Sequence, residues 1–185
     1  MRFLIRLEGG HIQGDLLEVV RGMAIELGID ARNPKWTSYG ALELDVFAPS
    51  RADFDLFMAA LAPLVGVEFT HDLNTTPRFR SEHELLSEAK ELFDSERYWE
   101  CHEVLEGVWR TKSGDERVLL QGMILVCAAF VHHQKGEDAV ALGILERAVR
   151  TLRFSQPSYG AFRVDRMRTY SEEILRGRRF FSFEA

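Results

Sequence analysis

Hydrophobic and polar residues alternate with a period of two in three stretches of the first 73 residues. Apolar residues occupy the odd positions of residues 3–7 and 65–69 and the even positions of residues 42–46, and the positions between them include the charged residues Arg6, Glu43, Asp45 and Glu68. Successive side chains of a strand point to opposite faces, so each stretch predicts a β-strand with one apolar face. A weaker strand is expected over residues 32–37.

Two stretches with helical periodicity lie between these strands. Apolar residues recur at steps of three and four over residues 15–27, which end before Gly28, and over residues 51–61, which follow a capping Ser50. The resulting order β-α-β-β-α-β is the ferredoxin-like split βαβ plan, and Pro34 suits the edge position of its second strand. The charged residues of the strands define a second sheet face, which should stay in contact with water unless a partner covers it.

The period changes to 3.6 residues after a loop-forming stretch near residues 73–77. Ser81 and Glu84 have the spacing of a capping box at the start of a helix. Short loops separate the helical patterns that follow, which predicts a bundle of antiparallel neighbours. These patterns cover about residues 81–94, 98–112, 115–135, 137–154 and 161–176. We therefore predict an α+β fold, with a ferredoxin-like βαββαβ domain over residues 1–73 and an all-α helical bundle over residues 81–185.

Composition and charge narrow the classes of function. The chain is 46% hydrophobic and 28% charged with a net charge of −6, which argues against a nucleic-acid coat protein or a polybasic membrane binder. The longest apolar run, residues 123–131, is too short to span a membrane. Cys101 and Cys127 form no C-x-x-C pair and are interpreted as small buried residues in a reducing compartment. We expect a cytoplasmic protein without a signal peptide.

The candidate chemistry lies in residues 101–109, CHEVLEGVW. His102, Glu106 and Trp109 recur at steps of four and three, so they share one face of a helix. Apolar residues are mixed with them, and we expect this face to point inward, where an imidazole and a carboxylate need partners. Glu103 lies about a quarter turn away and could only support such a site.

A second set of polar residues lies on the following helix. Gln121 and His132 share a face there, because eleven residues make almost three turns. If the two helices pack with these faces together, His102, Glu106 and His132 converge. Two imidazoles and a carboxylate suit zinc, iron, manganese or nickel, with open positions for a water that the metal could activate for hydrolysis. Trp109, Gln121 and Glu103 would support this metal site.

Other interpretations of these residues stay open. A hydrogen-bonded clasp, either His102–Glu106 or Glu106–His132, with the Trp109 indole N–H donating nearby, would satisfy the same groups without a metal. The protein would then be a non-catalytic interaction module. A third hypothesis is that these residues form an acid–base site or a ligand-binding site without a metal. The basic C-terminal segment could bind nucleic acid, but the acidic chain disfavours this, and we expect its phenylalanines to dock on the body.

The residues of this region resemble a known family, the bacterial and archaeal domain-of-unknown-function family 309. Its signature H-x-x-x-E-x-x-W/Y is present as His102, Glu106 and Trp109, and its Q-G pair and later histidine as Gln121-Gly122 and His132. The resemblance covers about residues 81–155. It implies a small helical bundle and a motif that has been suggested to bind metal, with no established activity.

The resemblance also marks what is particular to this chain. Where the family has an apolar residue after the histidine, this chain has His133. The N-terminal half lies outside the family domain and is similar in plan to small-ligand-sensing and dimerising domains. The expected partners are therefore a small molecule, a protein or a second copy in a homodimer, with neither a membrane nor nucleic acid among them.

Overall fold

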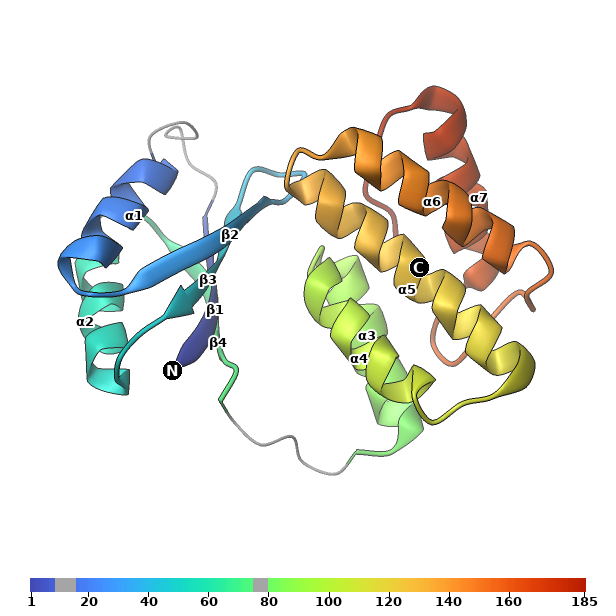
Figure 1. Ribbon diagram of the computed structural model, residues 1–185, viewed down its shortest axis with the longest axis horizontal. Helices are drawn as coiled ribbons and strands as arrows, with labels where there is room; N and C mark the ends of the chain where they lie inside the picture. Colours follow the sequence, from blue (N-terminus) through green and yellow to red (C-terminus); the bar gives the residue numbers. More distant parts are fainter. Residues whose placement is uncertain (9–15, 75–79) are drawn as a thin grey trace. The chain divides into compact units, whose positions relative to one another are not determined.

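The computed structural model describes residues 1–8, 16–74 and 80–185 (Figure 1). The chain divides into two compact units, Met1–Arg78 and Phe79–Ala185. In the first unit a four-stranded antiparallel sheet carries helices, and the second unit is helical. The predicted α+β class is thus confirmed. The predicted boundary between residues 73 and 81 includes residues 75–79, which lie outside the described residues.

The first unit follows the predicted order of elements. Its strand order is β2-β3-β1-β4, with all neighbours antiparallel. Strand β2 lies at an edge, where Pro34 costs no ladder hydrogen bond. The elements are β1 (Arg2–Leu7), α1 (Leu16–Glu26), β2 (Asp30–Trp36), β3 (Leu42–Phe47), α2 (Arg51–Leu61) and β4 (Val67–Asp72).

Helices α1 and α2 cover one face of the sheet (Figure 1). Val20 of α1 and Phe57 of α2 are fully buried in one cluster with Ile5 and Leu44 of the strands. This core forms because the apolar positions repeat every second residue in the strands and every three or four residues in the helices. Ser50 starts α2 by accepting a hydrogen bond from the Asp53 backbone N–H.

The other face of the sheet carries paired, buried charges. The side chains of Arg6, Lys35 and Glu43 are only 3–4% exposed. Arg6 donates to Glu43 at 2.9 Å, and Lys35 forms an ion pair with the same carboxylate. Arg2 donates to both oxygens of Asp45. The expected contact with water is therefore found for Arg2, whose side chain is 40% exposed, but not for Arg6, Lys35 and Glu43, whose burial is tolerated because each has a partner of opposite sign.

Strand β4 departs from the predicted alternation. Arg6 lies opposite Phe69 and Leu7 lies opposite Val67, with a register shift between them. Val67 packs against the apolar core, whereas Phe69 lies under the Arg6 guanidinium, 5.0 Å from the ring centroid. The prediction that Val67 and Phe69 share one face of the sheet is wrong. The bulge adds one residue to β4, so side chains on its two sides that are two positions apart point to opposite faces.

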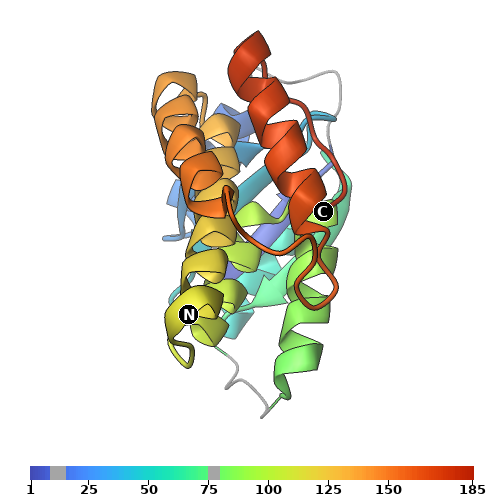
Figure 2. The ribbon, with the colours of Figure 1, turned by 90° about the vertical axis from the view of Figure 1, so that its right-hand side faces the viewer.

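The second unit is a bundle built around α5, which contacts α4, α6 and α7 (Figures 1 and 2). Helix α5 is central because its residues are apolar on nearly all sides between Met123 and Val131. No helix in the described residues combines the length and apolar character that a membrane crossing requires. The helices are α3 (Glu82–Asp94), α4 (Tyr98–Trp109), α5 (Gly114–Gln134), α6 (Asp138–Leu152) and α7 (Val164–Gly177).

Two local features organise this bundle, and the first of them was expected from the sequence. The capping box at α3 is present, since Ser81 Oγ accepts from the Glu84 backbone N–H and the Glu84 carboxylate accepts from the Ser81 N–H. Gly122, of the Q-G pair, lies where α5 meets α6. A Cβ at this position would be 2.5 Å from Leu152 Cδ2, so glycine permits the close approach of the two helices.

The segment after α7 packs back onto the bundle. The Phe183 ring lies 5.4 Å from Phe93 and 5.7 Å from Phe130, centroid to centroid. Phe180 stacks on His133 at 4.3 Å. The phenylalanines therefore dock this segment on the body, as predicted, while Arg178 and its basic neighbour remain exposed.

Candidate functional site

Helix α4 turns one stripe to the core and the neighbouring stripe towards the surface. Cys101, Leu105 and Val108 are at most 3% exposed. The predicted site residues each follow one of these by one position, or about 100° around the helix. The side chains of His102 and Glu106 are 21% and 35% exposed. The prediction that this face points inward is wrong, because the more apolar stripe beside it takes the core.

Two nitrogen atoms of this half-buried face lack a hydrogen-bond partner among the described residues. Nδ1 of His102 and Nε1 of Trp109 are shielded from solvent and make no hydrogen bond within the described part of the chain. The His102 ring stacks on Trp99 at 5.7 Å, and a Glu103 oxygen lies 3.6 Å from its Nδ1. The Arg117 guanidinium lies 3.6 Å from the Trp109 ring centroid. Stacking therefore holds both rings, while neither nitrogen atom makes a hydrogen bond to another described residue.

Glu106 and His132 have partners outside the predicted trio. Glu106 accepts a hydrogen bond of 2.9 Å from Arg110, one turn further along α4. His132 Nδ1 pairs with Glu137 across the turn into α6, and His133 makes the equivalent pair with the next acidic residue at 2.6 Å. The two imidazole side chains are 34% and 37% exposed, so neither histidine points into the core.

These positions do not fit a three-ligand metal site. The residues that the structure describes include no group of three or more His, Cys, Asp or Glu side chains that could hold a metal ion. His102, Glu106 and His132 therefore form no such group. Binding of zinc, iron, manganese or nickel stays a prediction without geometric support. Neither clasp, His102–Glu106 or Glu106–His132, is present among the described contacts, and the Trp109 indole N–H donates to neither.

Half-buried side chains of α4 and α5 nevertheless form a surface around the contact of Arg117 with Trp109. Gln121 and Leu125 follow Arg117 at steps of four on α5, and all three are partly exposed. This stripe meets that of α4 where Arg117 covers Trp109. We call the surface the motif face; it consists of Trp99, His102, Glu106, Trp109, Arg117, Gln121 and Leu125.

The two cysteines lie in the core of the same helix pair. Cys101 of α4 and Cys127 of α5 are fully buried, with their Sγ atoms 3.4 Å apart. Burial, reinforced by the neighbouring Cys127, raises the pKa of the Cys101 thiol well above its ordinary value. The Cys101 thiol therefore stays protonated and is a poor nucleophile or metal ligand. The interpretation of both as small buried residues agrees with their burial.

The part of the chain that carries the motif face matches a known protein family. Residues 86–144 match the family model described as Domain of unknown function (DUF309). The DUF309 match includes all of α4 and α5, and hence the whole motif face, and it leaves the first unit outside. No curated protein and no solved structure gave a significant match.

Two residues of the motif face were not predicted from the sequence. Trp99 lies three positions before His102, and Arg117 lies four positions before Gln121. Each therefore continues a stripe that had already been recognised, by one further helical turn. Extending the two stripes by one turn towards their N-termini would have found both residues.

Proposed function

We propose that this protein is a non-catalytic interaction module whose DUF309 segment binds a polypeptide partner through the motif face. The observation that carries this proposal is that His102 Nδ1 and Trp109 Nε1, both shielded from solvent, make no hydrogen bond to any residue that the structure describes. Buried polar groups are nearly always hydrogen-bonded, and leaving one unpaired costs about 1–3 kcal/mol. A partner that supplies hydrogen-bonding groups would remove this cost.

The two nitrogen atoms define what the partner must offer. The Trp109 indole N–H can only donate, so the partner must present an acceptor there, whereas neutral His102 can donate or accept through Nδ1. Seven positions on a helix correspond to about 10.5 Å along its axis. A polypeptide carries acceptors over such a length at many positions along its backbone, which favours it over a compact ligand with one polar group.

The surrounding side chains support a protein partner. Trp and Arg are enriched among the residues that dominate binding energy at protein interfaces, and the motif face contains Trp99, Trp109 and Arg117. Stacking contacts already hold these rings and the guanidinium in place. Little conformational entropy is then lost when a partner binds, because these side chains are ordered beforehand.

Photo-crosslinking in the cells that produce the protein tests this proposal. We expect p-benzoylphenylalanine at Gln121 to give one discrete adduct, and the same probe at Glu172, an exposed residue of α7, to give none. Trp109→Phe keeps an aromatic ring but removes the indole N–H, and we expect it to weaken the Gln121 adduct about tenfold. Equal labelling from both positions, or an adduct that Trp109→Phe leaves unchanged, would overturn the proposal.

Elemental analysis separates this proposal from the metal hypothesis. For protein purified without an affinity tag or chelator, we expect substoichiometric metal whose amount His102→Ala does not change. One equivalent of zinc, iron, manganese or nickel that is lost in both His102→Ala and Glu106→Ala would instead establish a metal centre. That result would contradict the proposal of a metal-free interaction module.

A further inference from the structure

Arg117 of the motif face carries a charge that no acidic side chain of the described ranges neutralises. Its Nη1 atom donates to the carbonyl oxygens of Trp109, at 3.3 Å, and Lys112, at 3.1 Å, where α4 ends. Its Nε and Nη2 atoms make no hydrogen bond to any residue that the structure describes, and the side chain is half-buried. A guanidinium donates through every nitrogen atom and stays charged at neutral pH, so this group can still bind an anion.

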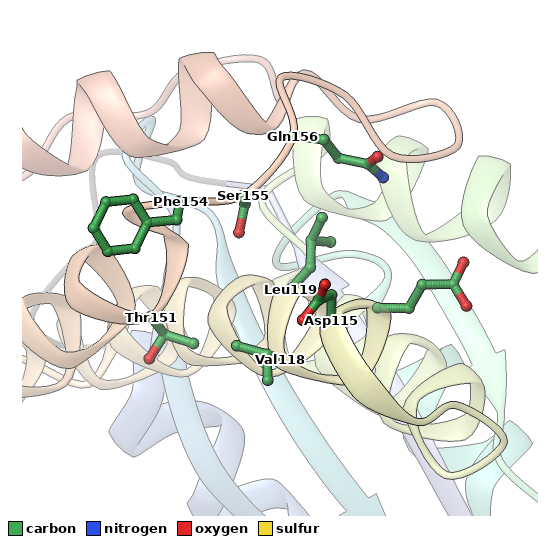
Figure 3. Close-up of a pocket in the computed structure, with 8 residues that line it drawn as sticks. Asp115, Val118, Leu119, Thr151, Phe154, Ser155 and Gln156 are labelled. Atoms are coloured by element: carbon green, nitrogen blue, oxygen red, sulfur yellow. The ribbon is translucent and has the colours of Figure 1, made fainter.

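The acidic residues closest to Arg117 in sequence lie on another side of α5. Asp115 and Glu116 line a cavity between the first turns of α5 and the end of α6, which Figure 3 shows. Glu116 is also 3.4 Å from the Lys112 ammonium. Positions one and two residues away point about 100° and 200° from Arg117 around the helix. Neither carboxylate therefore neutralises the guanidinium.

The indole of Trp109 places a second donor beside this charge. The Arg117 guanidinium lies 3.6 Å from the Trp109 ring centroid, so the donors of both groups lie at one end of the motif face. The indole Nε1 is shielded from solvent and makes no hydrogen bond within the part of the chain that the structure describes. A carboxylate can satisfy both groups, because each of its two oxygens accepts and it carries the opposite charge. A backbone carbonyl would satisfy only the indole and leave the charge uncompensated.

The other end of the motif face disfavours a second carboxylate. A Glu103 oxygen lies 3.6 Å from His102 Nδ1, and its negative charge would repel another acid there. Between the two ends, Glu106 is already paired with Arg110 at 2.9 Å. The surface is therefore cationic at one end and acidic at the other, which favours one direction for a bound acidic segment.

We propose that the polypeptide bound by the motif face is an acidic segment, and that one of its aspartate or glutamate carboxylates occupies the Trp109 end. This carboxylate accepts from the Trp109 indole N–H and pairs with Arg117, while backbone groups of the same segment lie near His102. The inference rests on the function proposed above and adds the chemistry of the partner to it.

Indole N–H resonances of the ¹⁵N-labelled full-length protein, titrated with the peptide acetyl-Ala-Glu-Ala-Glu-Ala-amide, test this inference. We expect a saturable downfield shift of the Trp109 resonance, which is assigned by its loss in Trp109→Phe. The same peptide with glutamine in place of both glutamates should give no shift. Arg117→Gln should weaken binding about three- to tenfold, and Arg117→Lys, which keeps the charge, should bind more tightly than Arg117→Gln.

Two controls accompany these variants. Arg166→Gln removes an exposed arginine from α7 and should leave the affinity unchanged. The indole resonances of Trp36 and Trp99 report whether each variant is folded, since both side chains are partly buried.

Several results would overturn the inference. They are an absence of shifts, an equal shift with the glutamine peptide, an affinity that Arg117→Gln does not change, and equal weakening by Arg166→Gln. The crosslinked adduct from Gln121 separates this failure from that of the proposed function. If the peptide does not bind but Trp109→Phe still weakens the adduct, the motif face binds a partner of different chemistry. If Trp109→Phe leaves the adduct unchanged, the proposed function itself is wrong.

Discussion

The ion pairs around Glu43 in the first unit and the motif face of the second unit differ in how their polar groups are paired. On the sheet of the first unit, Glu43 is buried and paired with both Arg6 and Lys35. On the motif face of the second unit, His102 and Trp109 each bury a nitrogen atom that makes no hydrogen bond to residues 1–8, 16–74 or 80–185. Paired groups satisfy one another within the fold, whereas unpaired ones reduce the stability of the free protein and become useful only on binding. The paired charges around Glu43 are therefore expected to be structural, whereas the motif face is where we propose that a partner binds.

The largest expected effect is the loss of the shared carboxylate in the first unit. Glu43→Gln leaves two cations buried without a counter-charge, and we expect it to destabilise this unit by about 3–5 kcal/mol. Hydrogen exchange of the β1 and β3 amides measures this loss separately from the second unit. Replacing Arg6, Lys35 and Glu43 together by Met, Met and Leu should recover most of it. A loss below about 1 kcal/mol in Glu43→Gln would show that the paired charges are not structural.

A much smaller effect is expected at the motif face. Glu106 is partly exposed, and its partner Arg110 lies four positions away on the same helix. Such a pair contributes about 0.3–0.5 kcal/mol, so Glu106→Gln should change the free energy of unfolding by no more than that. Urea unfolding followed by far-UV circular dichroism measures it. A loss above about 1.5 kcal/mol would show that the carboxylate serves as an interior clasp.

The smallest loss of stability is expected at the start of α3, and it depends on pH. The Lys112 ammonium, 2.8 Å from Glu82, lowers the pKa of that carboxyl, and the Tyr159 hydroxyl also donates to it. A lowered pKa in the folded state contributes stability above the unfolded value of about 4.3, and this contribution is lost as the pH falls through the folded value. Glu82→Gln should therefore lower the melting temperature slightly at pH 7.

Thermal melts of Glu82→Gln and the wild-type protein between pH 3 and pH 7 check this dependence. The difference in melting temperature should narrow below pH 4, because the wild-type carboxyl then becomes protonated. A difference that widens on acidification would contradict the assigned role of Lys112.

Most of the fold could be predicted because local periodicity determines it. The change from period 2 to period 3.6 separated the sheet from the bundle, and the capping residues Ser50 and Ser81 located two helix starts. The bulge in β4 could not be predicted, because the alternation of Val67 and Phe69 looks the same whether or not a residue is inserted. The pairing of charges on the sheet depends on strand register, which is set between segments that are distant in sequence.

The shared face of His102, Glu106 and Trp109 could be predicted, but its orientation and the separate place of His132 could not. His102, Glu106 and Trp109 do share one face, yet the stripe Cys101, Leu105 and Val108 lies one position away and competes for the core. The stripe Cys101, Leu105 and Val108 faces the core because it buries more apolar area, and both stripes can be recognised in the sequence. The pair between His132 and Glu137 depends on the geometry of the turn between α5 and α6, which residue spacing alone does not specify.

The most direct test of the central claim is the free energy of unfolding of His102→Phe. Phenylalanine can keep the stacking on Trp99 and removes the unpartnered Nδ1. If this nitrogen serves binding, the variant should be as stable as the wild type or up to about 1 kcal/mol more stable, since the ring is partly exposed and the cost of burial is incomplete. A loss of more than about 1 kcal/mol in urea unfolding would show that His102 holds the bundle together, and would contradict the account.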